Sequence, residues 1–157
     1  MQNRTRVLLT PTTVLPAVAL FSLVTVGFGG WSLLSLLTRE DGLTPFEEQF
    51  FRAGHGHAGV LLVMSLVVFI LMGRTRFSEA TQWVVGIGLL VGVLLQSGGF
   101  FLHLLVGAED SGSAGTLVTR TGAVLVAVAL VTVGVGLLRA GRPAVESVSE
   151  ASHKPHP

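Results

Sequence analysis

The sequence predicts an all-α integral membrane protein, a four-helix bundle whose helices cross the bilayer in up-down-up-down order. Two observations support this fold class. Half of the 157 residues are hydrophobic and only 12% are charged, whereas soluble domains carry about a quarter charged residues. The apolar residues also gather in four runs, each long enough for the roughly 20 residues that a membrane-spanning helix needs.

The four predicted spans are residues 13–37, 53–72, 80–106 and 116–138. Together they form one transmembrane domain, residues 1–140. The first run follows two arginines as a signal peptide would, but it is longer than the apolar region of such a peptide, so we expect a span. Residues 141–157 are rich in Ser, Glu, Pro and His, and they predict a disordered cytoplasmic tail.

The basic residues predict that both termini lie in the cytoplasm of a multi-pass protein of the cytoplasmic membrane. In a four-span arrangement, seven of the ten fall on the side of the termini, and cytoplasmic loops are those enriched in Lys and Arg. These seven are Arg4, Arg6, Arg74, Arg76, Arg139, Arg142 and Lys154. The other three are Arg39, Arg52 and Arg120.

Composition also restricts the function. The chain has no cysteine, which excludes disulfides, cysteinyl metal sites, iron–sulfur clusters and covalently attached c-type haem. A net charge of +1 gives no indication of a nucleic-acid partner. Phosphate loops, serine nucleophile elbows and dinucleotide fingerprints are absent from the sequence. We therefore expect a non-enzymatic role in the lipid bilayer rather than catalysis of a soluble-enzyme type.

Small residues predict how the spans pack, because lipid gives apolar helices no hydrophobic reason to associate and close backbone approach must do so instead. We expect contacts at the following positions of the third and fourth spans: Gly88, Gly92, Gly122, Ala123, Ala127 and Gly134. The Gly88-x-x-x-Gly92 spacing leaves a homo-oligomer or a larger membrane complex open.

The segment that leads into the second span is the most informative part of the sequence. Thr44, Pro45 and Glu47 form a T-x-x-E capping box with proline at the first helical position, so the helix should begin before the membrane. Glu48 and Arg52 are four residues apart and share a face. His55 follows on that face one turn later, whereas His57 points elsewhere, in line with Phe50, Ala53, Leu61 and Met64.

Four ionisable groups are predicted to meet at the extracytoplasmic end of the bundle: His55, His57, His103 and Arg120. His103 lies about one turn from the outer end of the third span, which runs antiparallel to the second, and Arg120 begins the fourth. Gln96 lies two turns deeper than His103. An ionisable side chain within a span indicates function by default, and here each has candidate partners.

One interpretation is a b-type haem for electron transfer. Two imidazoles from different helices of a bundle can ligate the iron, and an arginine can pair with a propionate. His57 and His103 would be the axial ligands, with Arg120 beside the propionate. Met64 is a weaker alternative ligand because it lies two turns deeper on the same helix as His57.

A second interpretation is a copper or zinc site for metal handling, formed by His55, His57 and His103 with Glu47 or Glu48. In a regular helix the two rings of His-x-His point about 200° apart, so this site needs a locally unwound segment. Gly54, Gly56 and Gly59 surround the pair and would permit unwinding.

Other interpretations remain open. The same residues could handle protons or sense pH, as in a small transporter or a regulatory subunit. They could also be structural parts of an accessory or scaffold protein. In that case Arg120 extends outward to pair with Glu109 or Glu48, and neutral histidines lie at a wet interface.

The run from Phe51 to Gly59, FRAGHGHAG, resembles the signature of an uncharacterised family of small bacterial integral membrane proteins with four predicted helices. The resemblance includes Gly-Phe-Phe at Gly99 and Gly-Val-Gly-Leu-Leu-Arg ending at Arg139, and it implies a fold but no established activity. A histidine–glycine pair entering a span is also similar to the haem-ligating helices of haem–copper oxidase and nitric oxide reductase subunits. Those subunits have further helices and histidines, so no oxidase activity is implied.

Overall fold

The computed structural model describes residues 10–39, 42–109 and 111–141. This part of the chain forms four α-helices: α2 (Pro11–Leu37), α3 (Pro45–Met72), α4 (Glu79–Val106) and α5 (Ala114–Ala140). No strand occurs within these described ranges. The predicted all-α fold with four helices is therefore confirmed.

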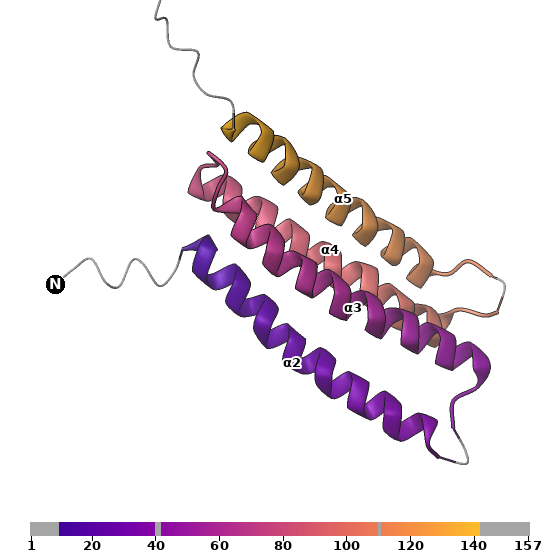
Figure 1. Ribbon diagram of the computed structural model, residues 1–157. Helices are drawn as coiled ribbons and strands as arrows, with labels where there is room; N and C mark the ends of the chain where they lie inside the picture. The colour runs from indigo at the N-terminus through magenta and orange to yellow at the C-terminus, as the bar shows by residue number, and fades with distance from the viewer. Residues whose placement is uncertain (1–9, 40–41, 110, 142–157) are drawn as a thin grey trace, which may run out of the picture.

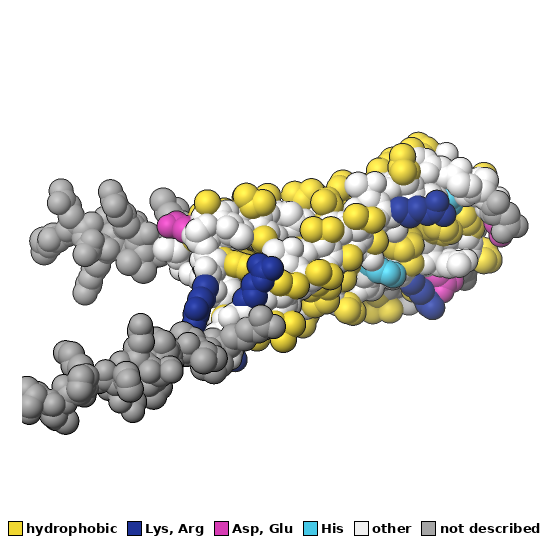
Figure 2. Space-filling view, turned by 90° about the horizontal axis from the view of Figure 1, so that it is seen from above, with side chains coloured by type: hydrophobic (Ala, Val, Ile, Leu, Met, Phe, Trp, Pro, Cys, Tyr) yellow, Lys and Arg dark blue, Asp and Glu magenta, His cyan; other side chains and the backbone are white. Residues whose placement is uncertain are grey.

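All four helices are long and apolar enough to cross a membrane. Each has 27 or 28 residues, which at a rise of about 1.5 Å per residue exceeds the roughly 30 Å hydrocarbon layer. Figure 2 shows a surface that is mainly hydrophobic between two ends, where the charged side chains gather. The predicted tail lies outside the described residues from 142 onward, as do Arg4, Arg6 and Lys154.

Polar caps explain where the helices begin. The Thr44 hydroxyl accepts the Glu47 amide at 3.3 Å, and the Glu47 carboxylate accepts the Thr44 amide at 2.8 Å. The predicted capping box therefore forms and starts α3 at Pro45, ahead of its apolar run. Ser78 caps α4 by accepting the amide of Thr81.

The helices are arranged with α3 and α4 at the centre (Figure 1). Successive helices run in opposite directions, so α3 and α5 begin at the end where α2 and α4 finish. We call this the histidine end, because His55 and His57 lie in the first half of α3 and His103 lies in the last turn of α4. α5 packs against α4 most closely, α2 packs mainly against α3, and α2 and α5 do not contact each other within the described chain.

The hydrophobic core lies toward the other end and the middle of the bundle. It uses the first half of α2, the second half of α3 and the central turns of α4 and α5. Its buried members are Leu15, Ala19, Leu62, Val68, Phe69, Met72, Leu89, Val93, Val126, Ala129 and Val133. The histidine end is thus left with fewer fully buried apolar side chains and more polar ones.

Glycines allow α4 and α5 to approach each other backbone to backbone. A Cβ atom at Gly99 would lie 2.6 Å from the Thr119 amide nitrogen, and one at Gly122 would lie 2.6 Å from the Gly92 carbonyl oxygen. The predicted contacts at Gly92 and Gly122 are therefore confirmed.

Three other packing predictions are wrong. A Cβ atom at Gly88 or Gly134 would meet nothing within 4 Å, and Ala127 is exposed. The reason is the register of the interface. The small residues that α5 buries recur every seventh position, at Gly115, Gly122, Ala129 and Gly136, so the other small residues fall on different faces.

Candidate functional site

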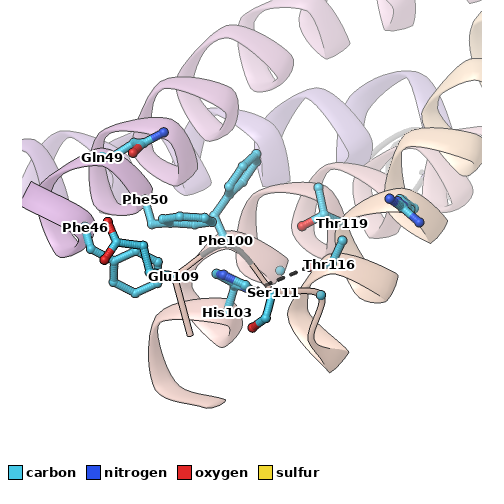
Figure 3. Close-up of a pocket in the computed structure, with 12 residues that line it drawn as sticks. Phe46, Gln49, Phe50, Phe100, His103, Glu109, Ser111, Thr116 and Thr119 are labelled. Carbon is cyan, nitrogen blue, oxygen red and sulfur yellow. Dashed lines mark hydrogen bonds between the residues drawn. The ribbon is translucent and has the colours of Figure 1, made fainter. Parts of the chain in front are cut away.

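A cavity of about 580 Å³ lies at the histidine end, where the first turns of α3 and α5 face each other across the end of α4. Figure 3 shows phenylalanine rings from α3 and α4 on one side and threonine side chains of α5 on the other. The lining residues are Phe46, Gln49, Phe50, Gly99, Phe100, His103, Glu109, Ser111, Gly112, Thr116, Thr119 and Arg120.

His103 is the most enclosed polar group of this cavity, with an exposed fraction of 4%. Its Nδ1 atom lies 2.6 Å from the Ser113 hydroxyl oxygen and 3.5 Å from that of Thr116. The imidazole also stacks on the ring of Phe50, with centroids 4.4 Å apart and planes inclined by 24°. These contacts fix the orientation of the ring from two sides.

The hydrogen bond at Nδ1 leaves the other ring nitrogen available. The Ser113 hydroxyl can accept a hydrogen bond as well as donate one. Nδ1 can therefore carry the ring proton and donate a hydrogen bond to Ser113. Nε2 then holds a lone pair, and every hydrogen bond of this imidazole within the described chain uses Nδ1. An imidazole in this state can ligate a metal ion or accept a hydrogen bond.

Arg120 adds a positive charge to the wall of the same cavity. Its side chain is exposed, and it forms no salt bridge within the described segments. Glu109 also lines the cavity. The structure places His103 and Arg120, which were predicted to meet at one end, in the lining of the same cavity together with Glu109.

His57 occupies a separate position on α3. Its Nδ1–H donates to the Ala53 carbonyl at 2.8 Å, and its exposed ring packs on Phe100 with centroids 4.9 Å apart. It does not line the cavity. Phe100 contacts Phe50 at a centroid distance of 6.2 Å, so the path from His57 to His103 runs through two phenylalanine rings.

His55 faces a third direction, toward α2. Cβ atoms built at Gly29 and Gly30 would lie 3.7 Å and 3.0 Å from atoms of its imidazole, so the ring packs against these two glycines. The expectation that His55 joins His103 and Arg120 is not met. The regular helix through His55 and His57 explains this, because α3 remains helical from Pro45 to Met72 and points the two rings to different sides.

The five residues proposed for copper or zinc are not brought together. Glu47 is engaged in the capping box of α3, and Glu48 forms an ion pair with Arg52 at 2.7 Å. The described residues contain no group of three or more His, Cys, Asp or Glu side chains that could hold a metal ion. The unwinding that this site required does not occur at Gly54, Gly56 or Gly59.

Ser113 and Thr116 are site residues that the sequence interpretation missed. The Ser113 hydroxyl accepts the Gly115 amide, and its own amide donates to the Thr116 hydroxyl, so the pair starts α5 as a capping box. The signal was the spacing Ser113-x-x-Thr116, which is weaker than the usual form with Glu or Gln at the second position. The same serine thus starts a helix and holds His103.

Comparisons with known proteins do not assign a family. No protein-family model matches this chain, and neither a curated protein nor a solved structure shows significant similarity to it. The resemblance of the FRAGHGHAG segment to small four-helix membrane proteins therefore stays a prediction.

Proposed function

We propose that this chain is a multi-pass protein of the cytoplasmic membrane that binds haem b at its outer end for electron transfer. Its helices would cross in up-down-up-down order with both termini in the cytoplasm. The seven-to-three distribution of basic residues supports this orientation. The histidine end, with the His103 cavity, would then face the extracytoplasmic side.

The observation that carries the proposal is the state of His103. A buried imidazole whose Nδ1 is held by a serine, and whose Nε2 is available beside a cavity, matches the usual arrangement of an iron-ligating histidine. Ligating histidines almost always use the second ring nitrogen in a hydrogen bond that fixes the ring. The cavity of about 580 Å³ is also within the range of cofactor sites.

The other residues of the cavity suit the parts of a haem. Arg120, which has no carboxylate partner in the described chain, would pair with a propionate at the rim. The rings of Phe46, Phe50 and Phe100 would contact the macrocycle. Attachment would be non-covalent because the chain has no cysteine. The bound haem would supply a one-electron couple.

His103 alone is the protein ligand in this proposal. Ligation by both His103 and His57 would require Phe50 and Phe100 to leave the positions that they occupy between the two imidazoles. The sequence-based pairing of His57 with His103 is therefore the less favoured form.

The test is a titration of the full-length protein in mild detergent with hemin, followed through the Soret band. We expect stoichiometric binding, loss of the band in His103→Gly, and its recovery when free imidazole is added. His55→Ala is the matched control, because its ring packs on α2 rather than in the cavity. His57→Ala should bind haem normally, and a loss of binding in that variant would favour ligation by both histidines.

Arg120→Ala should weaken haem binding about tenfold, the usual scale for one charge-assisted hydrogen bond. A colourless protein that binds no haem and retains its stability in His103→Ala would contradict the proposal. That outcome would favour the accessory or scaffold interpretation, in which Arg120 and Glu109 serve only to solvate the outer end of the helices.

A further inference from the structure

A second cavity, of about 430 Å³, lies between α2, α3 and α4. It does not share a residue with the His103 cavity, and it faces the opposite side of α4. Most of its lining is aliphatic, with Phe101 as its aromatic residue and three hydroxyl groups from Ser22, Thr25 and Ser97. We call it the lateral cavity.

Ser97 is the unexplained group of the lateral cavity. Its exposed fraction is 5%, and its hydroxyl has no hydrogen-bond partner. A buried hydroxyl without a partner is unfavourable, and in native proteins such groups usually find one. Ser97 lines the lateral cavity, and a rotation about its Cα–Cβ bond would let its covered hydroxyl hydrogen-bond to a molecule in this space.

The hydroxyls on the α2 wall are in a different state. Ser22 donates to the Val18 carbonyl at 2.9 Å, and Thr25 donates to the Ser22 carbonyl at 2.7 Å. Each hydroxyl has one proton, so both oxygens remain acceptors only. The cavity therefore offers a free hydroxyl on α4 and two acceptors on α2, with apolar side chains around them.

The lateral cavity is accessible from the lipid. Its lining includes Val18 and Leu94, which are 43% and 70% exposed, and both lie in the apolar surface that would face hydrocarbon. Ser97 lies about 14 Å along α4 from Val106, at 1.5 Å per residue. At this depth the acyl chains of phospholipids carry no polar group that could satisfy the hydroxyl.

We infer that the lateral cavity binds an isoprenoid quinone from the bilayer. This class of molecule dissolves in hydrocarbon and carries two oxygen atoms on opposite sides of a flat ring. One oxygen of the ring would bond to Ser97, with the ring beside Phe101. The other oxygen can bond to the α2 hydroxyls only in the reduced form, where it is an O–H donor. Because Ser22 and Thr25 can only accept, the reduced form, which has two O–H groups, should bind more tightly than the oxidised form. The inference is independent of haem binding, which uses other residues.

The test uses full-length protein in lipid nanodiscs and an azido-substituted quinone as a photoreactive probe, with decylubiquinone as competitor. We expect labelled peptides from α2 and α4, and competition at lower concentration by decylubiquinol. Ser97→Ala should raise the concentration for half-competition about three- to tenfold, the loss of one hydrogen bond. Ser65→Ala is its control, because Ser65 is buried but bonds within α3.

Filling the cavity gives a second measurement. Gly98 lines it, and a Cβ atom there would meet nothing within 4 Å, so Gly98→Leu should fill the space and abolish labelling. Gly88→Leu is the matched control on the same helix, since Gly88 is equally open but outside the cavity. Equal labelling in these two variants would overturn the inference. The inference would also be overturned if decylubiquinone did not lower the amount of labelling, because acyl chains would then fill the space.

Discussion

At the scale of single residues, Ser113 links the fold to the candidate site. Its hydroxyl accepts the Gly115 amide at the start of α5 and lies 2.6 Å from Nδ1 of His103 on α4. The orientation of the imidazole therefore depends on where α5 begins. Removing this hydroxyl affects both the helix and the ring, and a suitable control can separate the two effects.

We predict that Ser113→Ala lowers haem affinity at least tenfold, because outer-shell partners of ligating histidines typically contribute 10- to 100-fold. Ser78→Ala is the control. Ser78 caps α4 in the same manner but does not contact the site, so it should lose about 1 kcal/mol of stability with unchanged haem affinity. Equal affinities in the two variants, measured by hemin titration, would show that Ser113 has no role beyond capping.

A similar prediction applies to Thr44, whose side chain caps α3. Thr44→Ala should lower the free energy of unfolding by about 1 kcal/mol, because the Glu47 amide loses its acceptor. Thr121→Ala is the comparison, since that hydroxyl bonds only to the Leu117 carbonyl within a helix that is already formed. Denaturation in mixed micelles measures both, and a larger loss in Thr121→Ala would contradict the assignment.

Local features of the site could be predicted from sequence where they depend on spacing within one helix. The capping box of Thr44 and Glu47 and the pair of Glu48 with Arg52 are of this kind, and both form. The separation of His57 from His103 could not be predicted in this way. It depends on which side chains fill the space between two helices, and there the rings of Phe50 and Phe100 compete with any ligand.

At the scale of helices, the contact between α4 and α5 organises the histidine end. The glycines of the two helices bring their backbones together, so that Gly99 and Gly115 lie beside each other near His103. The sequence identified small residues as the packing elements but not the register. GxxxG spacing favoured Gly88, whereas the buried small residues of α5 repeat every seventh position.

We predict that Gly122→Ala destabilises the bundle by about 1–3 kcal/mol, the usual cost of overpacking a tight contact. A Cβ atom there would lie 2.6 Å from the Gly92 carbonyl oxygen, which belongs to the backbone and cannot rotate away. Gly134→Ala on the same helix meets open space and should be neutral or slightly stabilising, since alanine favours helix over glycine. Equal stabilities in thermal unfolding would contradict the proposed interface.

At the scale of the whole molecule, the predicted number and type of helices are confirmed because both follow from long apolar runs. Which helices pack at the centre of the bundle, and which at its periphery, could not be predicted from the sequence. Of the most apolar 18-residue stretch of α2, 11% is buried inside the bundle, which is the smallest share among the four helices. α2 also does not contact α5 in the described chain. All four helices are apolar on many sides, so composition alone cannot tell a central helix from a peripheral one.

The proposed orientation makes a prediction of its own. Alkaline phosphatase fused after Gly141 should be inactive and green fluorescent protein at the same point fluorescent, because α5 would end in the cytoplasm. Fusions after Gly112, between α4 and α5, should give the reverse pattern. An active phosphatase at Gly141 would invert the orientation and place the His103 cavity on the cytoplasmic side.

The central position of α4 has a consequence for how this molecule can diversify. One side of that helix, with Phe100 and His103, lines the His103 cavity, and the other, with Ser97 and Phe101, lines the lateral cavity. The opposing walls are supplied by α5 and by α2, which do not touch within the described ranges. Substitutions of lining residues on α2 should therefore alter the lateral cavity, and those on α5 the His103 cavity, with no direct contact between the two sets of residues.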